Sequence, residues 1–151
     1  MAGDAKDLRL EQQLCFAVYS AAHAFTRFYK PLLGRLGLTY PQYLVLLTLW
    51  ETDCLNVSAI GERLLLDSGT LTPVLKRLEA QGLVSRKRAE ADERQLVVSL
   101  TDKGRGLKKV AEGFPTQMLS ASECSAAELD AMRRMLFGLR DSLDTATEAA
   151  A

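Results

Sequence analysis

Apolar residues recur every three or four positions over long stretches of this chain, a spacing that places them on one face of an α-helix. The first such stretch, 8–30, follows Asp7, whose side chain can cap a helix N-terminus. A second begins after Thr39, with Pro41 in its first turn, and a last one follows the capping box at 125–128. We therefore predict a mainly α-helical chain with helices at both ends.

Residues 57–104 predict a different local structure. Gly82 suits the left-handed turn that ends a helix, and charged residues at 90–94 suit the tip of a hairpin. A turn at 53–56 is predicted to come first. It is followed by a helix at 58–66, a second helix ending at about Gln81, a strand at 83–88 and a strand at 95–100. Helix, tight turn, helix and a small β-hairpin is the order of a winged helix-turn-helix.

The second helix of this unit combines an apolar face with a polar end. Leu71, Leu75 and Leu78 are four and three residues apart, so they face a core. Hydroxyl groups at a helix N-terminus can approach phosphates and base edges, and basic residues one turn later can reach the DNA backbone. The residues of these kinds are Ser68, Thr70, Thr72, Lys76 and Arg77. Pro73 leaves the first residue of the helix open, and an ordinary solvated face would have the same composition.

Basic residues flank the tip of the predicted hairpin. Arg86 lies in the strand before the tip and Arg94 directly after it, with Asp92 close enough to orient the Arg94 guanidinium. An arginine on a hairpin tip suits a narrow minor groove, whose negative potential attracts it. The alternative is a charged turn without a ligand.

A family resemblance follows from these residues. The run DSGTLTPVLKRLEAQGLVSRKRAEADERQLVVSLTDKG resembles the DNA-binding core of the MarR regulators. Its D-S-G-T-L-T-P and D-E-R segments resemble the OhrR-type organic-hydroperoxide sensors, and the similarity spans about 8–143. The resemblance implies that the helix after the turn enters the major groove and that the wing arginine enters the minor groove. The implied DNA-binding residues are Ser68, Thr70, Thr72, Lys76, Arg77, Arg86, Asp92 and Arg94.

Charge is unevenly distributed along the 151 residues. The formal net charge is zero, whereas a DNA-binding domain is expected to be basic. Residues 73–109 carry ten basic and five acidic side chains, while 1–72 and 110–151 are acidic overall. The positive charge is therefore concentrated on the second helix, the wing and the helix that follows. The sequence contains no pattern of a membrane span or signal peptide, so a cytoplasmic location is expected.

Both ends of the chain carry more apolar surface than one small domain needs. We expect residues 1–151 to form a single domain with its winged core at 39–104, and 8–36 and 105–147 to be dimerisation helices. One of these, from Asp102 to about Leu119, contains Pro115 and is expected to bend there. A two-fold homodimer would place its recognition helices about 34 Å apart and prefer a palindromic operator. Packing of the first helix on the last within one chain is the alternative.

The three cysteines are odd in number and form no C-x-x-C pair, which disfavours a disulfide framework or a zinc site. Resemblance to the OhrR type implies that Cys15 is the redox-sensing thiol and that Tyr29 and Tyr40 donate hydrogen bonds to its thiolate. It further implies that Cys124 resolves the oxidised Cys15, as in the two-cysteine subgroup. Cys54 is interpreted as incidental.

A length argument links the thiol hypothesis to the dimer. Cys15 and Tyr29 are 14 residues apart, which is about 21 Å along one straight helix at 1.5 Å per residue. A tyrosine hydroxyl bonded to this thiolate must therefore come from the partner subunit. A buried, inert thiol with tyrosines packed in the core is the alternative.

Three functions remain open at this point. The favoured one is a repressor that organic hydroperoxides release from double-stranded DNA, by oxidation of Cys15 and disulfide formation with Cys124 of the partner subunit. A MarR-type repressor released by a small phenolic ligand and a thiol peroxidase are the alternatives. A basic wing has no use in a peroxidase. The lone His23 lacks metal-ligand or acid–base partners, and no phosphate loop or Ser-His-Asp order is present, so we predict no cofactor, no metal and no enzyme.

Overall fold

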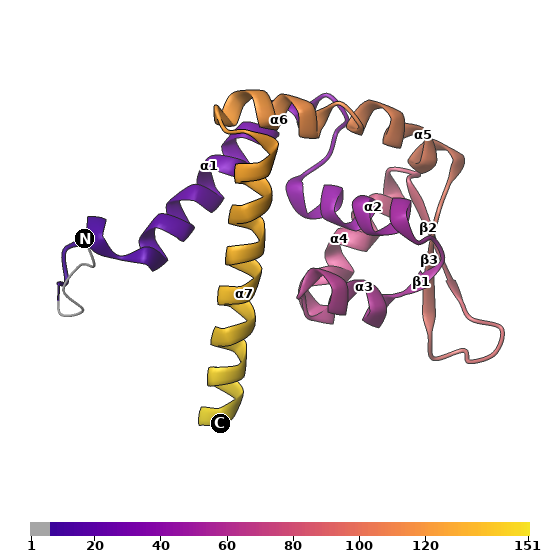
Figure 1. The fold of residues 1–151 in the computed structure, drawn as a ribbon. Coiled ribbons are helices and arrows are strands. Elements are labelled where there is room, and N and C mark those ends of the chain that lie inside the picture. Colours follow the sequence, from indigo (N-terminus) through magenta and orange to yellow (C-terminus); the bar gives the residue numbers. More distant parts are fainter. Residues whose placement is uncertain (1–6) are drawn as a thin grey trace. The chain divides into compact units, whose positions relative to one another are not determined.

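The structure is a computed structural model that describes residues 7–151 and divides the chain into two compact units, 1–108 and 109–151. Helices predominate in both units (Figure 1). The first unit contains, in order, η1 (Leu10–Gln12), α1 (Leu14–Gly34), α2 (Tyr40–Glu51), β1 (Leu55–Asn56), α3 (Val57–Leu64), α4 (Ser68–Ala80), β2 (Val84–Arg88) and β3 (Leu96–Leu100). Helix α5 (Asp102–Ala111) spans the boundary, and α6 (Phe114–Ser122) and α7 (Ala126–Ala150) complete the second unit.

The first helix differs from the prediction at both ends. Asp7 does not cap it; its carboxylate instead pairs with the Arg9 guanidinium at 2.6 Å, and a single 3-10 turn precedes Leu14. The predicted end at residue 30 is also wrong, because α1 runs on through Pro31 to Gly34. A proline removes only one backbone hydrogen bond, and the burial of the neighbouring Leu33 compensates for that loss.

The core of the first unit lies where α2, α3 and α4 meet. Val45, Leu46, Ile60, Leu71 and Leu78 have no exposed surface. The predicted stripe of α4 therefore faces this core, as expected. Its first residue, which the sequence left open, is Ser68, and Pro73 lies inside the helix. The winged helix-turn-helix fold is confirmed.

The wing is a three-stranded antiparallel sheet in the order β1-β3-β2. In the hairpin Arg86 faces Val98 and Arg88 faces Leu96, close to the predicted strands. The sequence missed β1 and predicted a turn there. Two residues, Leu55 and Asn56, are too few to show a strand pattern, and they form a strand only by pairing with β3.

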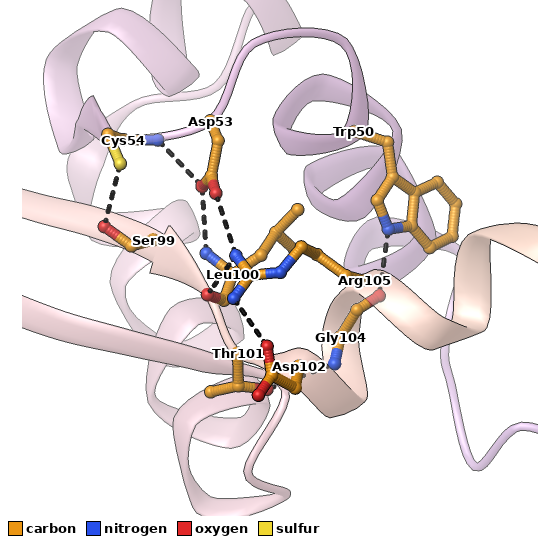
Figure 2. A network of polar contacts seen from close by, with 9 residues as sticks. All are labelled: Trp50, Asp53, Cys54, Ser99, Leu100, Thr101, Asp102, Gly104 and Arg105. Atoms are coloured by element: carbon orange, nitrogen blue, oxygen red, sulfur yellow. Dashed lines mark hydrogen bonds and ion pairs between the residues drawn. The ribbon is translucent and has the colours of Figure 1, made fainter.

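The base of the wing is held by the ends of α2 and α5 (Figure 2). Asp53, just after α2, accepts hydrogen bonds from the backbone N–H groups of Cys54 at 2.8 Å and Leu100 at 2.9 Å. Arg105 donates to the Leu100 carbonyl at 3.1 Å and pairs with Asp102 at 2.8 Å and Asp53 at 3.4 Å. The end of β3 is therefore fixed between two helices.

Thr101 and Gly104 make the turn from β3 into α5. The Thr101 hydroxyl accepts from the Gly104 N–H at 3.1 Å, which caps the start of α5, and donates to the Gly82 carbonyl at 2.6 Å. The Trp50 indole N–H donates to the Gly104 carbonyl at 2.9 Å (Figure 2). A Cβ on Gly104 would lie 2.1 Å from the Leu83 carbonyl oxygen, so only glycine fits here.

Prolines and caps divide the second unit. The predicted helix from Asp102 to Leu119 is two helices, because α5 ends at Ala111 and Pro115 stands in the first turn of α6. The backbone nitrogen in the first turn of a helix has no partner within the helix, so a proline there loses no hydrogen bond. Starting a new helix at Pro115 therefore costs less free energy than kinking a continuous one. The predicted capping box opens α7: Ser125 N–H donates to the Glu128 carboxylate at 2.7 Å, and the Ser125 hydroxyl accepts from Glu128 N–H at 3.2 Å.

No helix within residues 7–151 is both long enough and apolar enough to cross a membrane.

Candidate nucleic-acid interface and thiol site

The N-terminal end of α4 is exposed and firmly capped. The Asp67 carboxylate accepts hydrogen bonds from the Thr70 N–H at 2.8 Å and the Thr70 hydroxyl at 3.2 Å, and these bonds lower the pKa of Asp67. Ser68 and Thr70 are exposed and Thr72 is half-buried. The fold thus presents the hydroxyl groups predicted from the sequence at the positive end of a helix dipole, where phosphates bind favourably.

Lys76 and Arg77 lie further along the same helix. Both are exposed, while Leu75 and Leu78 beside them are buried. The structure therefore brings the two predicted basic residues to the solvent side of α4, on the same element as the hydroxyl groups. Such an arrangement can contact a nucleic-acid backbone.

The wing tip is shaped by its own backbone contacts. The Asp92 carboxylate accepts from the Arg94 N–H at 3.0 Å, and the Asp92 carbonyl accepts from the Gln95 N–H at 3.0 Å. Arg88 donates to the Glu93 carbonyl at 2.7 Å. Asp92 therefore orders the backbone of the turn and not the Arg94 guanidinium, which corrects the expected role. Arg94 itself is exposed on the tip.

Arg86 is engaged inside the domain. Its guanidinium pairs with the Glu79 carboxylate at 2.8 and 2.9 Å, and its backbone N–H donates to the same carboxylate at 3.2 Å. The Arg86 side chain is only 18% exposed, and the hydrogen bond from Arg86 lowers the pKa of Glu79. Arg86 thus fixes β2 to the last turn of α4 and positions the wing, and its contact with DNA stays a prediction.

The predicted thiol residues occupy opposite ends of α1. Cys15 is exposed in the first turn, and Tyr29 is buried near the other end of the same unbroken helix. At 1.5 Å per residue the 14 residues between them span about 21 Å. The two side chains of one chain therefore cannot meet, as the sequence argument required.

Tyr29 and Tyr40 do lie together, in a cluster with a third tyrosine. Their ring centroids are 5.6 Å apart, and Tyr43 lies 5.7 Å from Tyr29 and 6.2 Å from Tyr40. Burial raises the pKa of all three phenols, to about 12 for Tyr43. These hydroxyls therefore keep their protons at neutral pH. Sequence reasoning missed Tyr43, although its three-residue spacing from Tyr40 places both on one face of α2.

Cys124 belongs to the second unit, in the connection between α6 and α7. It is half-buried, its N–H donates to the Ser122 hydroxyl at 3.2 Å, and its thiol lies 3.4 Å from the Ser122 carbonyl. Cys54, which the sequence left without a role, adopts a positive φ of 58° beside Asp53 and accepts from the Ser99 hydroxyl at 3.4 Å (Figure 2).

Large apolar side chains are exposed on both terminal helices. On α1 they include Leu14, Tyr19 and Phe25, at 62%, 62% and 45% exposure, and on α7 Met135 and Phe137, at 74% and 50%. No residue of α7 is buried. Helices with apolar faces of this size are typical of contacts with another chain.

The chain is similar to known transcriptional regulators in sequence and in structure. A family model described as transcriptional regulator SarA/Rot matches residues 27–110. The organic hydroperoxide resistance transcriptional regulator of Bacillus subtilis (strain 168) is 49% identical over 136 residues, covering 90% of this chain and 92% of the relative. The solved structure of reduced AbfR bound to DNA is 38% identical with a TM-score of 0.79, covering 93% of this chain and 96% of that one. The structure of disulfide-formed AbfR is 42% identical, with a TM-score of 0.63 and coverages of 87% and 93%.

The family model covers more than half of the chain, and the Bacillus regulator matches it nearly end to end. These relatives are regulators of transcription and not enzymes, which removes the thiol peroxidase from consideration. The chain belongs to the MarR/SarA family of winged helix-turn-helix transcriptional regulators.

Proposed function

We propose that this regulator is a repressor that organic hydroperoxides release from DNA through oxidation of Cys15. The observation that carries the proposal is the position of Cys15, exposed in the first turn of α1, together with the proton-retaining Tyr29–Tyr40 pair at the other end of that helix. The relative from Bacillus subtilis is a regulator of organic hydroperoxide resistance, and AbfR has been solved in reduced, DNA-bound and disulfide-formed states.

The DNA-binding part rests on α4 and the wing. In the proposal α4 enters the major groove with Ser68, Thr70 and Thr72 at its leading end, and Lys76 and Arg77 contact the backbone. The exposed Arg94 enters the adjacent minor groove. Asp92 supports this contact by fixing the backbone of the turn that carries Arg94. The excess of positive charge in residues 73–109 supports this orientation.

Arg94→Ala should weaken operator binding by about tenfold or more, since an arginine in a groove is worth roughly 1–3 kcal/mol. Fluorescence anisotropy titration of a labelled palindromic duplex at fixed salt measures this change. Arg134→Ala is the matched control, because it removes another exposed arginine, on α7, where it pairs with Asp130. Equal affinities of the two variants would contradict the assignment of the wing.

The sensing part requires a homodimer. The exposed apolar faces of α1 and α7 support contacts at 8–36 and 105–147, and a two-fold dimer would bring the tyrosines of one protomer to Cys15 of its partner. Phenol O–H donors favour the thiolate, which is the reactive form. A dimer of this kind binds a palindromic operator in the cytoplasm.

The proposed redox chemistry is balanced as follows. The Cys15 sulfur attacks the terminal oxygen of the hydroperoxide, the O–O bond breaks, and the alcohol leaves after taking a proton, so that a sulfenic acid remains. The Cys124 thiol of the partner subunit then attacks the Cys15 sulfur, the S–S bond forms, and the oxygen leaves as water. Its position in the connection between α6 and α7 supports Cys124 as the resolving thiol.

Operator affinity measured before and after an organic hydroperoxide tests the sensing step. In the proposal the unsubstituted protein loses affinity and Cys15→Ser does not.

A further inference from the structure

The C-terminal end of α4 is attached to the connection between α1 and α2 through one side chain. Gln81, the residue directly after α4, donates from Nε2 to the Gly37 carbonyl at 2.7 Å. Its Oε1 accepts from the Gln42 Nε2 at 3.2 Å. Gln81 therefore holds α4 to two points that lie about forty positions away in the sequence.

Gln42 continues this chain of hydrogen bonds into the first turn of α2. Its Oε1 accepts from the Thr39 N–H at 2.9 Å, which completes the capping box of α2. The Gln42 residue is only 3% exposed, so water cannot replace these partners. The hydrogen bonds from Thr39 through Gln42 and Gln81 to Gly37 form a chain of amide groups, which we call the amide relay.

Only amide side chains can make this relay. Each glutamine donates with its nitrogen and accepts with its oxygen, and both functions are used at Gln42 and at Gln81. A carboxylate can only accept, and a methionine of similar size can do neither. Rotating either amide by half a turn would place two oxygens or two N–H groups against each other.

The relay begins where the tyrosine cluster sits. Tyr40 lies between Thr39 and Gln42 in the sequence, in the same first turn of α2, and Tyr29 lies in α1 before Gly37. The other end of α4, about 20 Å away for a 13-residue helix, carries Ser68 and Thr70. A displacement of the first turn of α2 therefore acts directly on the C-terminal end of the helix proposed to read DNA.

We propose that Gln42 and Gln81 are positioning residues that couple the Tyr29–Tyr40 pair to the recognition helix α4. The regulatory effect of this coupling rests on the proposed function. When the tyrosines move, the relay shifts the first turn of α2 and the end of α4 together. Without the relay, α4 keeps its contacts with the core but no longer follows the tyrosines.

A second clamp on α4 provides a contrast. Glu79, two residues before Gln81, binds Arg86 and so joins α4 to the wing and not to the first turn of α2. Its loss should change DNA affinity by the same factor in the reduced and oxidised protein. Loss of the relay should change the ratio between the two states.

The first experiment needs no oxidant. Amide hydrogen exchange at the Thr39 N–H is measured by NMR. This group donates to the Gln42 Oε1, and Gln81 in turn orients the Gln42 amide by accepting from its Nε2. Gln81→Met should accelerate this exchange several-fold, and Gln81→Glu, which keeps the acceptor for Gln42, should do so less. Gln117→Met, at an exposed glutamine of α6, should leave it unchanged. Equal exchange in Gln81→Met and Gln117→Met would overturn the relay.

The second experiment measures the operator Kd with and without cumene hydroperoxide. In Gln81→Met and Gln42→Met the ratio of oxidised to reduced Kd should fall by roughly 2- to 30-fold, the range of coupling carried by residues outside both sites. In the double variant the Kd ratio should fall no further than in either single variant. In Glu79→Gln the Kd ratio should equal that of the unsubstituted protein. An unchanged ratio in both glutamine variants would refute the coupling. If the unsubstituted protein itself ignores peroxide, the proposed sensing fails, and the exchange measurement still decides whether the relay exists.

Discussion

Cys15→Ser should bind its operator with the same affinity before and after an organic hydroperoxide, whereas the unsubstituted protein should lose affinity by about 5- to 150-fold, the usual range of allosteric coupling. Serine cannot form a sulfenic acid, and its hydroxyl is close in size to the thiol, so DNA binding by the reduced state should be preserved. Anisotropy titrations with a palindromic duplex, with and without the oxidant, measure both quantities.

The chain offers a matched control for this substitution. Cys54, like Cys15, is an exposed cysteine outside any disulfide, but it lies beside the wing and accepts a hydrogen bond from Ser99. Cys54→Ser should therefore retain the full peroxide response. Cys124→Ser should still be oxidised at Cys15 but should form no intersubunit disulfide on a non-reducing gel. Release of Cys15→Ser by peroxide would exclude Cys15 as the sensor.

Gly104→Ala should destabilise the protein by about 3 kcal/mol or more, near the upper end of overpacking effects. The added Cβ would lie 2.1 Å from the Leu83 carbonyl oxygen, which is backbone and cannot move aside without breaking the Thr101 N–H bond to that oxygen at 3.1 Å. The thermal midpoint should fall by roughly 6–12 °C for a chain of this size. Differential scanning calorimetry measures it.

Gly106→Ala is the internal control, since it adds the same methyl group to the same helix with no atom within 4 Å. It should be neutral or slightly stabilising, because alanine favours a helix over glycine by up to about 1 kcal/mol. If both variants melted at the same temperature, the close packing of α5 on the turn before β2 would be wrong.

Features governed by neighbouring residues could be predicted from the sequence. The caps at Thr39 and Ser125 depend on side chains within three positions, and both helix starts were found. The apolar stripe of α4 was found for the same reason, because helical spacing alone decides which residues face the core. The continuation of α1 through Pro31 was not predicted, because it depends on the burial of Leu32 and Leu33 against the rest of the unit.

Features that depend on tertiary contacts were missed or given the wrong partner. Arg86 was expected to contact DNA, and its ion pair with Glu79 was missed because Glu79 lies on another element. Asp92 is a local exception: it was expected to orient the Arg94 guanidinium, and its carboxylate accepts a hydrogen bond from the Arg94 backbone N–H. The Gln42–Gln81 contact joins residues that carry no charge and belong to no motif, so no sequence pattern could reveal it.

The two tyrosine positions implied by the family resemblance do lie together in this fold, at 5.6 Å between ring centroids. Their contact with a thiolate remains a proposal, since it requires a second protomer. The length of α1 makes that requirement strict, because no bending of an unbroken helix brings its first turn to its last turns. The proposed sensing mechanism therefore requires the proposed dimer.

The most direct test is one titration of the unsubstituted protein on a palindromic duplex taken from upstream of its own gene. It is carried out on the reduced protein, then after an organic hydroperoxide, and then after dithiothreitol. The account predicts tight binding, loss of binding and recovery in that order. Tight binding that is indifferent to the peroxide would contradict redox control and favour a small-molecule effector.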